Sequence, residues 1–174
     1  MLPGALISLL TFPGVIVHEW AHKKFCEWFD VEVLEVKYFK FNNILSFKTG
    51  PAGYVIHEEP KNFKQTFWIS VGPLVLNSFI CVMLGIFAST VDSKSGEYLL
   101  LLWLGLSVGA HSFPSDHDAK NILERSRHHL KNEGSMLHYL SYPFFILIWL
   151  ANKLSFFWFD FIYAIILLQF AGAL

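Results

Sequence analysis

Five consecutive residues carry the chemistry most visible in this chain: His18-Glu19-Trp20-Ala21-His22, an HExxH motif. In an α-helix, residues four apart share a face, so His18 and His22 can present two imidazoles to one metal ion. Glu19 then stands beside that ion as a general base, an arrangement typical of a zinc hydrolase. HExxH also occurs by chance on soluble helices, where the two histidines are ordinary surface residues.

The sequence around the motif is apolar enough to lie within a membrane. The chain of 174 residues is 54% hydrophobic and only 16% charged, with a mean hydropathy of +0.45. Ionisable side chains inside an apolar span are costly and persist mainly where they face a polar site. We therefore favour a metal site over a chance pair. The net charge of −1 gives no indication of a nucleic-acid partner.

Five apolar stretches approach the roughly 20 residues that cross a bilayer. They cover about residues 3–29, 65–91, 98–113, 136–152 and 155–174. Pro13-Gly14 predicts a kink ahead of the motif, and Pro114 predicts the end of the third span. We expect a mainly α fold, a polytopic membrane helix bundle forming one domain over residues 1–174. Its catalytic core would cover about residues 3–119, with accessory helices at about 136–174.

Lysine and arginine placement orients the expected spans. Of the 13 such residues, all but Lys94 and Lys153 lie at the C-terminal end of the first span, between the first and second spans, or between the third and fourth. The positive-inside rule then places the N-terminus outside and the C-terminus in the cytoplasm, at the cell membrane. The C-terminal ends of the first and third spans would meet towards the cytoplasmic side.

The chain after the third span supplies candidates for a third metal ligand. Ser115-Asp116-His117-Asp118 would reach the same depth as the motif from the same side. A catalytic zinc commonly has three protein ligands, and a carboxylate completes two histidines well. Asp116, His117 and Asp118 are all candidates. In an alternative interpretation, Ser115 and Asp118 form a helix-capping box.

Together these elements resemble the site-2 protease type of intramembrane zinc metalloproteases. The resemblance covers about residues 3–119 and rests on the HExxH motif, on Gly72-Pro73 followed by Asn77, and on an aspartate after a proline-broken third span. It implies a three-helix catalytic core and one zinc ion, with Glu19 as the general base. It also implies a membrane-embedded protein or peptide as substrate, cleaved within or next to its transmembrane segment.

The aspartate lies in an unusual setting for that family, which places it in Asn-Pro-Asp-Gly or Leu-Asp-Gly. Here the run is Pro114-Ser115-Asp116-His117-Asp118-Ala119. We prefer Asp118, because a small residue follows it as glycine follows the family's aspartate. The expected metal ligands are therefore His18, His22 and Asp118.

Residues 31–58 differ from the spans and predict a β-hairpin or small sheet between the first two helices. Residues 31–34, 36–41, 44–47 and 54–56 are rich in β-branched and aromatic residues, and Asn42-Asn43 offers a turn. One hypothesis is that this sheet binds an unwound substrate as an added strand. The alternative is an interfacial sheet without that role.

Asn77 is a polar residue within the second span, and two roles are open for it. It could bind the substrate backbone or the developing oxyanion. It could instead form a hydrogen bond between helices, as a lone intramembrane asparagine commonly does.

Two alternatives to an intramembrane protease remain. One is a membrane-anchored zincin of the soluble type, but its extended HExxHxxGxxH motif is not matched at Phe25 and Trp28. A non-enzymatic membrane scaffold or zinc-binding protein with a relic motif is opposed by the intact Glu19. Neither the substrate nor the oligomeric state follows from the sequence.

Overall fold

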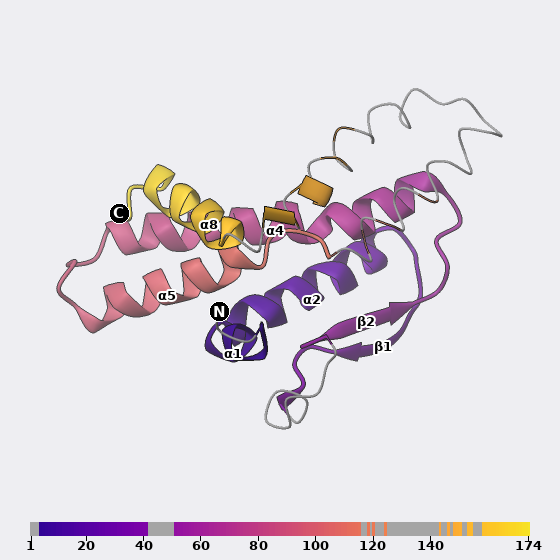
Figure 1. The fold of residues 1–174 in the computed structure, drawn as a ribbon, viewed down its shortest axis with the longest axis horizontal. Coiled ribbons are helices and arrows are strands. Elements are labelled where there is room, and N and C mark those ends of the chain that lie inside the picture. Colours follow the sequence, from indigo (N-terminus) through magenta and orange to yellow (C-terminus); the bar gives the residue numbers. More distant parts are fainter. Residues whose placement is uncertain are drawn as a thin grey trace.

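The computed structural model describes residues 4–41, 51–115 and 158–174, together with residues 118, 120, 124, 143, 146, 148–150, 153 and 154. The elements in order are α1 (Gly4–Leu10), α2 (Phe12–Trp28), β1 (Val33–Lys37), β2 (Tyr54–His57), α4 (Phe63–Ser89), α5 (Gly96–Ala110) and α8 (Phe159–Phe170). The predicted mainly helical fold with a small sheet between the first helices and the next is confirmed (Figure 1).

The long helix α4 is the element on which the others assemble (Figure 1). Helix α2 packs against its first half, whereas α5 and α8 pack against α4 and against each other. The hairpin of β1 and β2 contacts α2. Helix α4 begins at an Asn62 cap, whose side chain accepts a hydrogen bond from the Gln65 N–H, and it continues through Pro73 without ending.

Small residues allow α5 and α4 to approach the last helix closely. A Cβ at Gly109 would lie 2.7 Å from the Ala164 Cβ, and one at Gly105 would lie 2.8 Å from a Leu168 methyl carbon. Gly85 on α4 is equally close, since a Cβ there would lie 2.6 Å from the Ala171 Cβ. Such small-residue contacts let helix backbones pack tightly, as in membrane helix bundles.

The expected first span is divided into two helices, and the break lies close to the predicted kink. Helix α1 ends at Leu10, and α2 begins at Phe12, with Pro13 in its first turn where no N–H is needed. Side chains of α5 bind backbone carbonyls at this break: the Trp103 indole N–H donates to the Leu10 carbonyl at 3.0 Å, and the Ser107 hydroxyl donates to the Thr11 carbonyl at 2.9 Å.

Helix length bears on how many times the chain crosses a membrane. Among the described residues, α4, with 27 residues, is the one helix long and apolar enough to cross. Helices α5, with 15 residues, and α8, with 12, are apolar but shorter. Most of the expected fourth span lies outside the described residues. The bundle of five spans therefore stays a prediction.

The two strands form an antiparallel pair in which Val36 faces Val55 and Lys37 faces Tyr54. A register shift between Val33 and Glu35 gives the first strand an irregularity. Both strands fall within residues 31–58, the segment predicted to form a hairpin or small sheet. The expected Asn42-Asn43 turn and the stretch 44–47 lie outside the described residues.

Candidate metal centre

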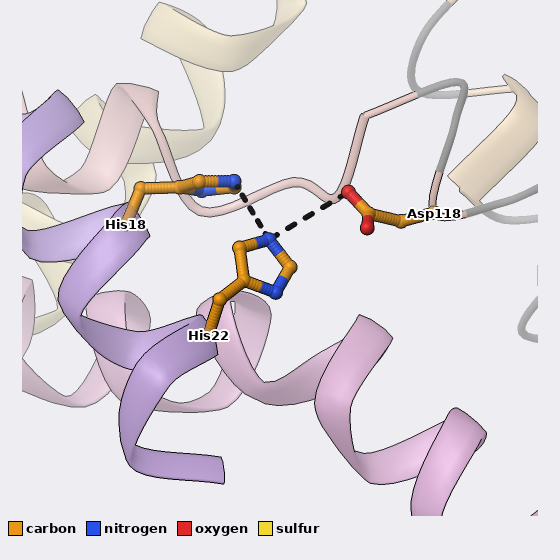
Figure 2. A group of neighbouring side chains, drawn as sticks. All are labelled: His18, His22 and Asp118. Atoms are coloured by element: carbon orange, nitrogen blue, oxygen red, sulfur yellow. Dashed lines mark hydrogen bonds and ion pairs between the residues drawn. The ribbon is translucent and has the colours of Figure 1, made fainter. Parts of the chain in front are cut away.

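His18, His22 and Asp118 come together in the structure, as the sequence predicts. The two histidines project from one face of α2, and Asp118 reaches them from the chain that follows α5 (Figure 2). The two Nε2 atoms are 3.2 Å apart, and the His22 Nε2 lies 3.6 Å from the Asp118 Oδ2. All three possible ligand atoms lie within 4.8 Å of one another, so this group could hold a metal ion.

Main-chain carbonyls fix the orientation of both imidazoles. The His18 Nδ1 lies 2.7 Å from the His111 carbonyl oxygen, and the His22 Nδ1 lies 2.9 Å from that of Ile69. A carbonyl oxygen can only accept, so each Nδ1 carries the ring hydrogen and donates it. Histidines that bind metals usually donate their other ring N–H in this way.

The same hydrogen bonds leave the two Nε2 atoms facing each other without a proton when the rings are neutral. Two lone pairs at 3.2 Å repel each other unless a cation lies between them. Nitrogen ligands about 2.0–2.1 Å from a tetrahedral zinc lie about 3.3–3.4 Å apart, close to this separation. His22 is only 7% exposed, so water does little to screen the repulsion. The donor set and its spacing therefore fit a divalent ion.

Asp118 also makes the hydrogen bonds of a capping box. Its Oδ2 accepts from the Ser115 N–H at 2.9 Å and from the Ser115 hydroxyl at 2.6 Å, and its own N–H donates to the Ser115 Oγ at 3.3 Å. The two interpretations of this residue are thus compatible, because the box directs the carboxylate towards His22. The competing candidates Asp116 and His117 lie outside the described residues.

Glu19 lies on α2 beside the hairpin. A Cβ at Gly53 would lie 2.6 Å from the Glu19 Cγ and 2.7 Å from the Tyr38 carbonyl oxygen, so only glycine lets the chain pass this close to the carboxylate. Lys40, whose N–H is bonded to the Ala52 carbonyl at 2.7 Å, interacts electrostatically with Glu19. The start of β2 therefore forms one wall beside the expected general base.

The hairpin carries its own polar contacts outside the helices. The Tyr54 hydroxyl donates to the Glu35 carboxylate across the sheet, and this hydrogen bond raises the pKa of Tyr54. The Lys40 ammonium lies 3.9 Å from the centre of the Tyr54 ring. These contacts hold the start of β2 against β1 and against the segment that follows β1.

Asn77 is fully buried and lies behind His18. Its side-chain N–H donates to the His111 carbonyl at 2.9 Å, the same oxygen that accepts from His18. Asn77 therefore makes the hydrogen bond between helices that the sequence left as one of two roles. The other role, contact with a substrate, stays a prediction.

Some contacts of this centre were not predicted. The Ile69 and His111 carbonyls hold the imidazoles, and Gly53 lies against Glu19. His111 also binds through its side chain: its Nε2–H donates to the Thr11 hydroxyl at 2.8 Å, since that hydroxyl donates to the Ile7 carbonyl. A sequence does not show which backbone carbonyls will bind side chains. Pro73 nevertheless indicates that the carbonyl of Ile69, four residues earlier, lacks its helical donor.

Comparisons with known proteins do not identify a family for this chain. No protein-family model, curated protein or solved structure matches the chain.

Proposed function

We propose that this protein is an intramembrane zinc metalloprotease of the site-2 protease type, which hydrolyses peptide bonds in or next to transmembrane segments of membrane-anchored substrates. One observation carries the proposal: His18 and His22 both donate Nδ1–H to carbonyls, so their Nε2 atoms are free for a metal beside Asp118. Two imidazoles and a carboxylate suit a catalytic zinc, whereas magnesium and calcium prefer oxygen ligands.

The exposed surface of the helices supports a membrane setting. Helices α4, α5 and α8 expose large apolar side chains such as Phe79, Trp103 and Phe170, whereas Asn77 and Ser107 are completely buried. An apolar exterior with small and polar residues between helices is typical of membrane bundles. The proposed protein crosses the membrane several times, with its N-terminus outside and its C-terminus in the cytoplasm.

Charged residues at the end of α2 support a site near the cytoplasmic side. Lys23 and Lys24 follow His22 directly, and their ammonium groups lie 3.5 Å and 2.7 Å from the Glu27 carboxylate. These side chains are about one third exposed, as expected for lysines at a membrane surface. The proposed centre would thus lie close to the cytoplasmic surface of the membrane.

The residues of the centre have distinct roles in the proposed hydrolysis. A zinc ion held by His18, His22 and Asp118 would polarise the scissile carbonyl and acidify the attacking water. Glu19 accepts a proton from that water and delivers it to the leaving nitrogen as the C–N bond breaks. The Ile69 and His111 carbonyls keep both imidazoles in the tautomer that this role requires.

We propose that the hairpin presents the substrate. β2 begins at Tyr54, next to Gly53, whose backbone lies against Glu19. A protease must hold its substrate extended, and a strand added to a sheet edge is extended by its hydrogen bonds. We include strand addition beside β2 in the proposal, because it would bring the scissile bond close to Glu19.

The cleavage experiment uses purified protein in detergent with a panel of transmembrane peptides, with and without a chelator. The proposal expects products that disappear with the chelator and return when zinc is restored. Glu19→Gln should keep the zinc but lower the cleavage rate about 10²–10⁴-fold, because the proton transfer is lost. Zinc binding without any chelator-sensitive product would favour the zinc-binding scaffold instead.

A second variant separates substrate presentation from catalysis. Val55→Pro should lower cleavage and leave zinc content unchanged, because proline disturbs β2 without touching a ligand. Val55→Thr keeps the backbone N–H and serves as the matched control. Equal cleavage by both variants would remove strand addition from the proposal and leave the metal chemistry intact.

A further inference from the structure

Helix α4 contains a proline close to the metal centre, and this proline leaves one backbone carbonyl of the helix without its usual donor. In an α-helix, the N–H of each residue donates to the carbonyl four residues earlier. Pro73 has no N–H, so the Ile69 carbonyl lacks this helical donor although both residues lie well inside α4. Pro73 and Ile69 are both buried, so the vacant carbonyl needs another partner.

His22 is that partner. Its Nδ1–H donates to the Ile69 carbonyl at 2.9 Å, across the contact between α2 and α4. The residue before the proline makes this approach possible: a Cβ at Gly72 would overlap the Phe25 ring, one turn further along α2. Gly72 thus lets the helices come close enough for the hydrogen bond that Pro73 makes available.

We propose that Gly72-Pro73 is a positioning pair for the metal ligand His22: Gly72 allows the close approach, and Pro73 reserves the Ile69 carbonyl for the His22 Nδ1–H. This inference rests on the proposed metal site. A residue with an N–H at position 73 would compete for the carbonyl and draw it back along the helix axis. His22 would then be held less firmly with its Nε2 towards His18 and Asp118.

His18 supplies an internal control. Its Nδ1–H is bonded to the His111 carbonyl, which lies just beyond the end of α5 at Ala110. No proline is needed there, because carbonyls at a helix end have no helical donor. A change at Pro73 should therefore alter His22 and leave the hydrogen bond of His18 as it is.

The test compares Pro73→Ala with Pro73→Gly in the full chain in detergent, titrated with zinc. Both variants restore the N–H, so both should bind zinc about 10–100-fold more weakly than the unaltered protein, and to the same extent. Their thermal midpoints without metal should differ, because glycine is the poorer helix former. Val75→Ala, a change on the exposed face of the same helix, should leave zinc affinity unchanged.

A second readout follows the ring hydrogens directly. In nitrogen-proton NMR spectra of the zinc-loaded protein, the His22 Nδ1–H signal should shift in both Pro73 variants, whereas the His18 signal should not. Zinc affinities within twofold of the unaltered protein, with an unmoved His22 signal, would overturn the inference. Failure of the unaltered protein to bind zinc would instead overturn the proposed function.

Discussion

Pro13 and Pro73 interrupt the hydrogen bonding of neighbouring helices with different results. At Pro13 the helix itself is interrupted, since α1 ends at Leu10 and α2 begins at Phe12. At Pro73 the helix continues to Ser89. The two sites also differ in the partners of nearby carbonyls: side chains of α5 bind the Leu10 and Thr11 carbonyls ahead of Pro13, whereas a candidate metal ligand binds the Ile69 carbonyl that lacks its donor because of Pro73.

The first junction, near Pro13, has a purely structural role, whereas the second junction, near Pro73, orients a candidate metal ligand. Near Pro13, the Trp103 and Ser107 side chains do no more than complete backbone hydrogen bonding in an apolar setting, where unpaired groups are costly. Near Pro73, the hydrogen bond determines which nitrogen of His22 is available. Substitutions at the first junction should change stability, and substitutions at the second should change metal affinity.

The largest effect is expected at Gly14, where α2 contacts α5. A Cβ there would overlap the Ser107 carbonyl oxygen and lie 2.7 Å from the His111 ring. Because backbone atoms cannot move aside, Gly14→Ala should cost about 3 kcal/mol or more of stability, measured as a lower thermal midpoint in detergent. Gly96→Ala is the control, since a Cβ at Gly96 meets nothing within 4 Å. Equal midpoints for both variants would contradict the close contact.

Ser107→Ala should have the next largest effect. It should lower the stability of the protein and leave its zinc affinity unchanged. The hydroxyl donates to the Thr11 carbonyl and accepts from the Gly14 N–H, both at 2.9 Å. Losing these bonds should cost about 1 kcal/mol each, while zinc affinity stays the same. Ser89→Ala removes a hydroxyl from an exposed position and should change neither quantity. A large loss of zinc affinity in Ser107→Ala would show that the two junctions are not separate.

Asn77→Ala tests whether the Asn77 amide helps to hold the His111 carbonyl that orients His18. Without the Asn77 amide, the His111 carbonyl loses one of its two donors but keeps His18. Zinc affinity should fall about tenfold, at the lower end of the range for residues that support metal ligands. Zinc titration checks this, with Ser78→Ala on the same helix as the control. Unaltered affinity would mean that Asn77 joins the helices without supporting His18.

The smallest effect is expected for Trp103→Phe. The variant loses the indole donor to the Leu10 carbonyl but can keep aromatic contact with Phe12, whose ring centre lies 5.9 Å from that of Trp103. Trp103 is partly exposed, so the cost should stay below about 1 kcal/mol. Thermal midpoints check this, and a change in zinc affinity would contradict a purely structural role.

Local sequence patterns predicted the parts of this molecule that depend on neighbours in the chain. The four-residue spacing of His18 and His22 fixed their common face, and β-branched residues predicted the strands of the hairpin. Pro13 predicted a kink ahead of the motif, although the sequence did not indicate that α1 and α2 would be separate helices.

Contacts between distant residues could not be predicted in the same way. His22 meets the carbonyl of Ile69, and His18 meets that of His111, through the packing of three helices. Every residue has a carbonyl, so no residue type marks the one that will be used. The approach of Gly53 to Glu19 is likewise a consequence of tertiary packing, since glycine is common in loops whatever packs beside them.

The central claim is that His18, His22 and Asp118 hold one zinc ion. It is tested most directly by elemental analysis of zinc per chain in the purified protein and in Asp118→Ala and Asp116→Ala variants. The account predicts close to one zinc per chain in the unaltered protein and in Asp116→Ala, and little in Asp118→Ala. Full zinc content in the Asp118→Ala variant, or none in the unaltered protein, would contradict it.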